Sequence, residues 1–160
     1  MTQASVTPRL IPEFEYHADV SGIHDVGPGP LGRRMIGSIA GGDLVGKRLK
    51  GSIVGAGAEW LLLSSDGFGR LDTRTTFRTV DGAHIYMQFS GLLEMTHAVM
   101  ALLSGGDTPT NFGDQYFFID PRLETGDKRY SWVNQTLFIG QGGHASRSRL
   151  EFRVYRVENA

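Results

Sequence analysis

Glycines divide this chain into short segments. The sequence contains 22 glycines among 160 residues, about twice the share of an average protein. Between Arg34 and Ser64 they separate three segments with apolar residues: Arg34 to Ala40, Leu49 to Val54 and Glu59 to Ser64. Short segments at regular spacing, with glycine corners between them, are typical of a β-sandwich or a β-barrel. The sequence therefore predicts a mostly β, antiparallel fold.

The remaining segments fit the same pattern. The clearest hairpin joins residues 71–77 to residues 84–90, because the Asp-Gly pair in residues 80–83 is a turn of the kind that connects adjacent strands. A first strand is predicted over Arg9 to Val20, followed by a long, stiff loop that includes residues 27–32. Further strands are predicted over Gln115 to Asp120, Tyr130 to Ile139 and Leu150 to Val157, with a polar loop from Gln141 to Arg149.

One helix is predicted within this series of strands. Apolar side chains recur at helical spacing between Leu92 and Leu103, and Gly105-Gly106 ends the run. Its amphipathic face would cap one end of a sheet or barrel. At 160 residues the chain has the usual length of one domain, so we expect a single β-barrel domain over residues 1–160.

The charge balance argues against several classes of partner. Lys and Arg total 16, and Asp and Glu total 17, so no strong field is present to bind nucleic acid or an anionic membrane. The absence of cysteine excludes disulfides and thiolate zinc sites, and no run approaches the roughly 18 apolar residues of a membrane-spanning helix. We expect a cytoplasmic protein with neither a nucleic-acid nor a membrane partner. These features are compatible with a monomer and with a homo-oligomer.

Sequence motifs for metal or cofactor binding are missing. The five histidines show no H-x-H or H-E-x-x-H spacing, so each is expected to be a surface or core histidine. Residues 27–32 match the dinucleotide pattern G-x-G-x-x-G, but two prolines remove backbone donors and no helix pattern follows. We therefore expect no metal and no cofactor.

Strand periodicity sorts the polar residues into faces. On the predicted strand over residues 71–77, Asp72 and Arg74 share one face, and His84 and Tyr86 share one face of its hairpin partner. Both faces could simply be solvated. On the predicted strand over residues 130–139, Trp132 and Asn134 share a face, which suits either the wall of a barrel with a mixed interior or core packing.

Several motifs carry a resemblance to a known family. They include Gly57-Ala58-Glu59-Trp60, Leu71-Asp72-Thr73-Arg74 and, most specifically, Pro121-Arg122-Leu123-Glu124-Thr125-Gly126 with the segment from Tyr130 to Gly140. From Pro8 to Val157 the chain resembles the family called domain of unknown function 3237. The resemblance implies a small calycin-like β-barrel with an interior pocket. Glu59 stands where that family usually has Asp before the Trp.

The polar inventory leads to one preferred hypothesis for function. It is a cofactor-independent lyase or isomerase that acts by acid–base chemistry on a small hydrophobic, aromatic substrate inside the barrel. Asp72 would be the general base, Tyr86 or His84 would return the proton, and Arg33 or Arg74 would hold a developing oxyanion.

The substrate-binding residues are expected to be further side chains lining the same interior. They are Arg33, Glu59, Trp60, His84, Glu124, Trp132 and Asn134, beside the catalytic set Asp72, Arg74 and Tyr86. The alternative hypothesis is a non-catalytic barrel that binds such a small hydrophobic or aromatic ligand. In that case Asp72 and Arg74 would form a buried ion pair that holds the register of the barrel.

Overall fold

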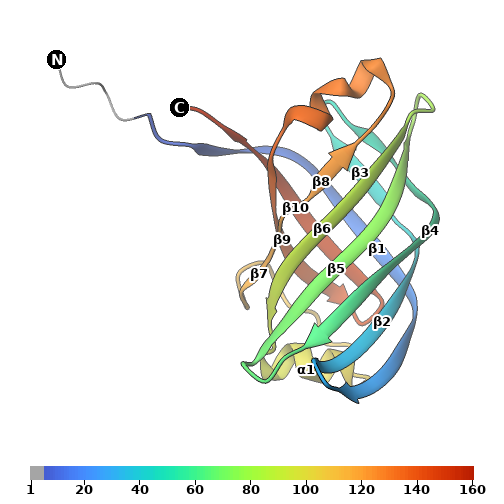
Figure 1. Cartoon of the computed structure of the whole chain (residues 1–160), viewed down its shortest axis with the longest axis vertical. Helices are drawn as coiled ribbons and strands as arrows, with labels where there is room; N and C mark the ends of the chain where they lie inside the picture. Colours follow the sequence, from blue (N-terminus) through green and yellow to red (C-terminus); the bar gives the residue numbers. More distant parts are fainter. Residues whose placement is uncertain (1–5) are drawn as a thin grey trace.

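The computed structural model describes residues 6–160, which form a strand-rich fold (Figure 1). In chain order its elements are β1 (Arg9–Gly29), β2 (Gly32–Gly41), β3 (Asp43–Gly46), β4 (Lys50–Leu63), β5 (Phe68–Thr79), β6 (His84–Glu94), α1 (His97–Leu103), β7 (Phe117–Ile119), β8 (Arg122–Glu124), the 3-10 helix η1 (Lys128–Gln135), β9 (Phe138–Ser146) and β10 (Arg149–Glu158).

The strands form one antiparallel sheet that closes on itself. Neighbours follow the order β10-β9-β7-β6-β5-β4-β2-β1, and β1 pairs back onto β10, which makes a ring of eight strands. The short strand β3 pairs with both β1 and β4, and β8 pairs with β6. The prediction of a mostly β, antiparallel fold is confirmed, and the Asp-Gly hairpin joins β5 to β6 as expected.

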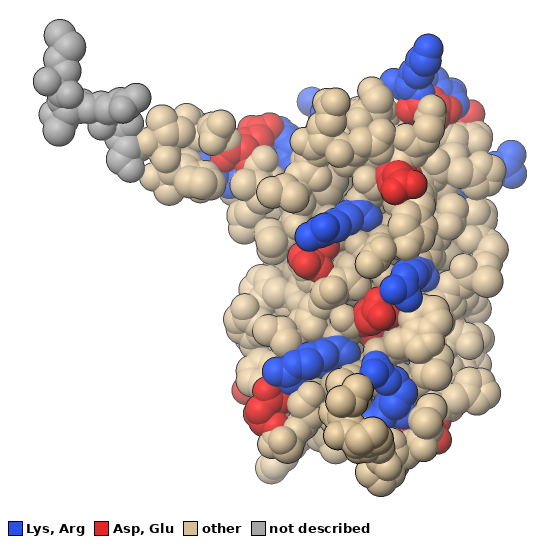
Figure 2. Space-filling view, in the orientation of Figure 1, with Lys and Arg blue, Asp and Glu red and all other residues tan. Residues whose placement is uncertain are grey.

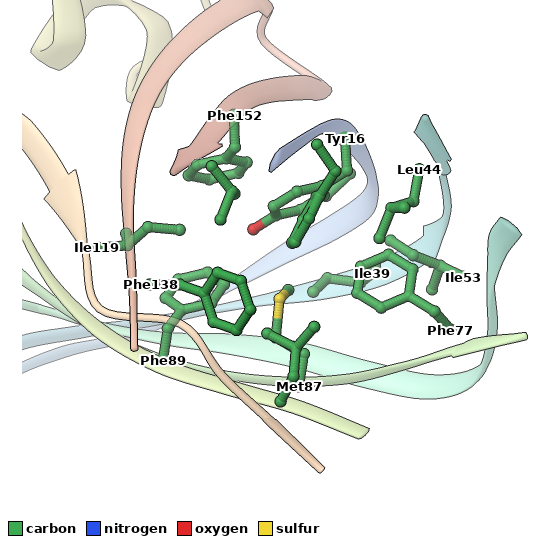
Figure 3. Packing of buried hydrophobic residues seen from close by; sticks show 14 of the residues in the cluster. Tyr16, Ile39, Leu44, Ile53, Phe77, Met87, Phe89, Ile119, Phe138 and Phe152 are labelled. Atoms are coloured by element: carbon green, nitrogen blue, oxygen red, sulfur yellow. The ribbon is translucent and has the colours of Figure 1, made fainter. Parts of the chain in front are cut away.

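Aromatic side chains fill much of the ring's interior. Tyr16 stacks on Phe152, with ring centroids 4.7 Å apart, and meets the edge of Phe77 at 5.6 Å. Figure 3 shows these rings together with Met87, Phe89 and Phe138. Alternate residues of each strand point inward, so every wall contributes large apolar groups to one shared core.

Helix α1 covers one end of the ring (Figure 1). It buries Val99 and Leu102, and the Thr96 hydroxyl caps it by accepting a hydrogen bond from the Val99 N–H at 3.3 Å. The helix is shorter than predicted, because residues 92 and 93 pair with β7 and continue β6. Pairing between strands therefore overrides the helical spacing at the start of the predicted segment.

Three further predictions of local structure were wrong. Residues 128–135 form η1 in place of a strand, since Asp127 caps a helical turn and Tyr130 and Val133, three residues apart, are both buried. Residues 141–146 belong to β9, which pairs with β10, so the predicted polar loop shrinks to a tight turn. β1 extends through residue 29 by pairing with β2 through bulges, so the predicted stiff loop is also a tight turn.

Candidate functional site

An interior cavity of about 90 Å³ lies between the aromatic core and helix α1. Its walls are mostly apolar and include Met35, Leu61, Leu71, Phe89 and Leu102. The volume is several times the ~10–15 Å³ that one water molecule needs. The cavity can therefore hold a small, largely apolar molecule, and the polar groups that reach its walls define the candidate site.

Glu59 is the carboxylate at this cavity. It lies on β4 with Gly37 of β2 on one side and Thr73 of β5 on the other. One carboxylate oxygen accepts the Asp72 backbone N–H at 2.9 Å, and the other accepts the Thr73 hydroxyl. Both donors come from the neighbouring strand, so the pairing of β4 with β5 fixes the position of the carboxyl group.

Burial raises the pKa of Glu59 to about 7. The nearby charge of Asp72 also raises this pKa, while the two hydrogen bonds and the charge of Arg34 lower it and only partly offset the burial. A carboxyl group with a pKa near 7 is present in both protonation states at neutral pH. Glu59 can therefore accept a proton or donate one, as a general acid–base group must.

Two hydroxyl groups in the interior lack a partner. The hydroxyls of Tyr16 and Thr75 are buried and form no hydrogen bond within residues 6–160. Both residues line the cavity, and Figure 3 shows the Tyr16 hydroxyl pointing into the interior. Burial and the charge of Glu59 raise the pKa of Tyr16 well above its usual value. Tyr16 therefore keeps its proton and can donate a hydrogen bond to a ligand.

His144 brings a third polar group to the cavity wall. Its Nδ1 lies 3.2 Å from the Thr110 hydroxyl oxygen, and its ring stacks on Phe117 with centroids 5.5 Å apart. Burial lowers the pKa of His144 to about 4. The imidazole is therefore neutral at physiological pH.

Asp72 and Arg74 lie on the outside of the ring, so their predicted place in the interior was wrong. Each side chain is 46% exposed, and the two form a surface ion pair with a closest separation of 3.5 Å. The buried residues of β5 are the odd-numbered ones, including Leu71 and Phe77, so the even-numbered face meets solvent. The alternative of a buried Asp72–Arg74 pair was wrong for the same reason.

Three other predicted site residues also lie on outward faces. The Tyr86 hydroxyl donates to the Gln88 side chain at 3.1 Å, and Trp60 lies under the Arg74 guanidinium, 5.6 Å from it. His84 is exposed. On β6 the polar side chains face outward because the alternate face, with Ile85 and Met87, packs into the core. On β4 the order is reversed, since Glu59 faces the cavity and Trp60 faces outward.

The last four predicted residues are separated from the cavity by the fold. Trp132 and Asn134 belong to η1. The Arg48 guanidinium lies 3.8 Å from the centroid of the Trp132 ring. The Asn134 side chain accepts the Thr125 backbone N–H at 2.8 Å and donates to the Thr125 carbonyl at 2.9 Å. Glu124 is exposed on β8, and Arg33 pairs with Asp25 on the surface. Of the predicted set, Glu59 is therefore the residue that faces the cavity.

Four residues at the cavity were not among the predicted site residues: Tyr16, Thr73, Thr75 and His144. A signal existed for the two threonines, because they share strand parity with the apolar residues Leu71 and Phe77. None existed for His144, whose role depends on Thr110, 34 residues away in the chain.

Many of the charged residues outside the cavity form ion pairs on the surface. On the face drawn in Figure 2, Lys and Arg lie beside Asp and Glu. Arg70 and Asp66 form one of the surface ion pairs within residues 6–160. Within residues 6–160, His, Asp and Glu form no group of three placed to hold a metal ion. No helix in that range has the length and apolar character to cross a membrane.

The exposure of Asp72 leads to a stability prediction. Asp72→Asn is expected to change the free energy of unfolding by less than about 1 kcal/mol, because exposed ion pairs contribute little. Urea unfolding of both proteins at pH 7 measures this difference. A loss of several kcal/mol would contradict the placement of Asp72 on the surface.

The chain has relatives in sequence and in structure. A family model described as "Protein of unknown function (DUF3237)" matches residues 8–157. A UPF0311 protein from Rhodopseudomonas palustris (strain TIE-1) is 32% identical over 130 residues, which cover 81% of this chain and 82% of that protein.

Solved structures share the fold over almost the whole chain. A beta-barrel like protein from Acinetobacter baumannii AYE has a TM-score of 0.80 at 28% identity, covering 99% of this chain and 100% of that one. An enzyme from Penicillium herquei has a TM-score of 0.71 at 17% identity, with coverage of 99% and 100%. At that identity the likeness shows the fold alone.

Proposed function

This chain belongs to the DUF3237 family of proteins of unknown function, and we propose that it catalyses acid–base chemistry on a small, largely apolar molecule inside the ring. The reaction class is that of a cofactor-independent lyase or isomerase. Within the proposal the ring is a calycin-like barrel, an architecture suited to holding a small ligand. The membership agrees with the resemblance carried by the sequence motifs.

The observation that carries this proposal is the Glu59 carboxyl group at the wall of an apolar cavity. Its pKa of about 7 matches the requirement for a group that takes and returns a proton near neutral pH. This assignment replaces Asp72, which lies on the outer face of the ring. The enzyme from Penicillium herquei supports it only in that a similar fold can hold a catalytic site.

The residues suggest a definite sequence of steps. The Glu59 carboxylate removes a proton from the carbon next to a carbonyl group, and the electron pair moves onto the carbonyl oxygen. The Tyr16 hydroxyl donates a hydrogen bond to that oxygen and stabilises its negative charge. In a β,γ-unsaturated carbonyl compound, protonated Glu59 then returns the proton to the γ-carbon, the electron pair on oxygen re-forms the C=O bond, and the C=C bond moves to the α,β position. In a β-hydroxy carbonyl compound it instead protonates the hydroxyl group on the β-carbon, so that the C=O bond re-forms, the Cα=Cβ bond forms, the Cβ–O bond breaks and water leaves.

A non-catalytic binding protein is the second candidate. The mostly apolar walls and the unpartnered hydroxyls of Tyr16 and Thr75 favour it equally, because such a cavity holds a ligand whether or not chemistry follows. The two candidates differ in what Glu59 does. Only the enzyme requires its carboxyl group to move a proton.

Hydrogen–deuterium exchange in D₂O tests this difference without knowledge of the natural substrate. Proton NMR would follow the α-protons of acetophenone and cyclohexanone in the presence of the protein. The wild-type protein is expected to accelerate their exchange, increasingly as the pH rises through about 7 and Glu59 loses its proton. Glu59→Gln is expected to slow the exchange by about 100-fold or more.

Asp72→Asn is the matched control for this experiment. It removes a neighbouring carboxylate from the outer face of the ring and leaves the cavity intact, so exchange is expected to persist. Equal exchange by the wild-type protein and Glu59→Gln would contradict the proposal. Binding of the ketones without any accelerated exchange would favour the non-catalytic candidate.

A further inference from the structure

His144 lies on the wall of the ring opposite Glu59. The ring has eight strands, and β9, which carries His144, is four places from β4, which carries Glu59, in either direction. Both side chains line the same cavity. A ligand in contact with Glu59 at one end therefore presents its other end to the wall of His144.

The hydrogen bonds around Thr110 determine which nitrogen of His144 carries the proton. The Thr110 hydroxyl oxygen accepts the Gln115 side-chain N–H at 3.1 Å and the His144 backbone N–H at 3.3 Å. These two donors occupy its two lone pairs. With the Gln115 amide in this orientation, in which its Oε1 is buried without a partner among residues 6–160, the Thr110 hydroxyl donates its own hydrogen to Nδ1 of His144, 3.2 Å away.

An imidazole that accepts at Nδ1 carries its hydrogen on Nε2 when it is neutral. Burial keeps His144 neutral, with its pKa lowered to about 4. Within residues 6–160 the ring forms no hydrogen bond through Nε2. The Nε2–H group is thus a donor of fixed tautomer on a side chain that lines the cavity.

We infer that His144 binds a second oxygen of the ligand, at the end remote from Glu59. This inference rests on the proposed function and narrows its substrate class to small compounds with two oxygens on opposite sides of an apolar body, such as a dicarbonyl or a hydroxy-carbonyl compound. One oxygen belongs to the reacting carbonyl near Glu59 and Tyr16. The other accepts the Nε2–H of His144.

Two ketones of nearly equal shape test this inference. In 1,4-cyclohexanedione the two oxygens lie across the ring, and in 4-methylenecyclohexanone a CH₂ group replaces one of them. Ligand NMR measures the affinity of each ketone for the wild-type protein and for His144→Phe. The ratio of the two affinities is taken for each protein and then compared between the proteins, so that the different hydration of the two ketones cancels. His144→Phe keeps an aromatic ring against Phe117 and removes the donor.

The preference for the dione is expected to fall about tenfold in His144→Phe, which corresponds to one hydrogen bond to a buried group. Asp72→Asn, on the outer face of the ring, should leave the preference unchanged because it leaves the cavity and His144 intact. An unchanged preference in His144→Phe, or failure of both ketones to bind the wild-type protein, would overturn the inference. A preference that depends on His144 without any proton exchange would instead contradict the catalytic proposal alone.

The tautomer is measured separately, and it needs no ligand. Nitrogen-15 NMR of the His144 ring at pH 7 is expected to show Nε2 protonated and Nδ1 bare. Thr110→Val should mix the two tautomers, whereas Thr110→Ser keeps the hydroxyl and should preserve the wild-type spectrum. Protonation of Nδ1 in the wild-type protein would overturn the inference and leave the role of Glu59 untouched.

Discussion

Replacing Glu59 by glutamine is expected to stabilise the protein above pH 7 by about 3 kcal/mol and to change its stability little below pH 4.5. The folded-state pKa of Glu59 is about 7, against 4.5 for an ordinary Glu. Between these values the unfolded chain has lost the proton while the folded chain retains it. Wild-type stability therefore falls as the pH rises from 4.5 to 7, and an uncharged glutamine avoids this loss.

The substitution also keeps the local hydrogen bonds. The amide oxygen of glutamine can accept the Asp72 N–H, and its NH₂ group can donate to the Thr73 hydroxyl. Urea unfolding at pH 4, 5.5 and 8.5 measures the effect. Glu124→Gln, at an exposed position on β8, is the control and is expected to change stability little at any of these values. A stability gain for Glu59→Gln that does not vary with pH would contradict the buried carboxyl group.

His144 gives the same experiment a second readout. Its folded-state pKa of about 4 lies below the ordinary 6.5, so the unfolded chain binds a proton first as the pH falls. The contribution of His144 to stability is therefore lost between pH 6.5 and 4, opposite in direction to that of Glu59. Between pH 4.5 and 6.5 in the wild-type protein, Glu59 makes the free energy of unfolding fall as the pH rises, and His144 makes it rise. In Glu59→Gln the contribution of Glu59 is gone, so the free energy of unfolding should rise with pH between 4 and 6.5 because of His144.

Gly42→Ala is expected to destabilise the fold by more than about 4 kcal/mol. Gly42 joins β2 to β3 with φ at +147°, and its carbonyl accepts the Ile53 N–H at 2.8 Å. A Cβ added there would lie 1.9 Å from the carbonyl oxygen of His17. Because that oxygen belongs to the backbone of β1, the clash cannot be relieved by turning a side chain.

The adjacent glycine provides the control. A Cβ at Gly41 would meet no atom within 4 Å, and the backbone there lies outside the left-handed region. Gly41→Ala is therefore expected to change stability by less than about 1 kcal/mol. Thermal unfolding followed by circular dichroism compares the two variants. Similar melting temperatures would show that the corner between β2 and β3 tolerates a side chain.

Local sequence patterns were enough to predict the class of fold and the range of residues that matches the family. Glycine spacing identified the antiparallel strands, the Asp-Gly turn located the hairpin of residues 71–90, and the motifs covered residues 8–157. It also included Glu59 among the site residues. These features depend on local chemistry, such as turn geometry and alternating side chains, which neighbouring residues specify on their own.

The inward and outward faces of each strand depend on how the whole ring folds. A strand repeats every two residues, so periodicity separates Asp72 and Arg74 from Thr73 and Thr75 without stating which pair is buried. That choice follows from the closure of the ring, where residues 9–19 of β1 pair with residues 149–158 of β10. The same closure brings His144 to the wall opposite Glu59. The pairing of β1 with β10 joins segments more than 100 residues apart, so it depends on the fold of the whole chain and cannot be predicted from neighbouring residues.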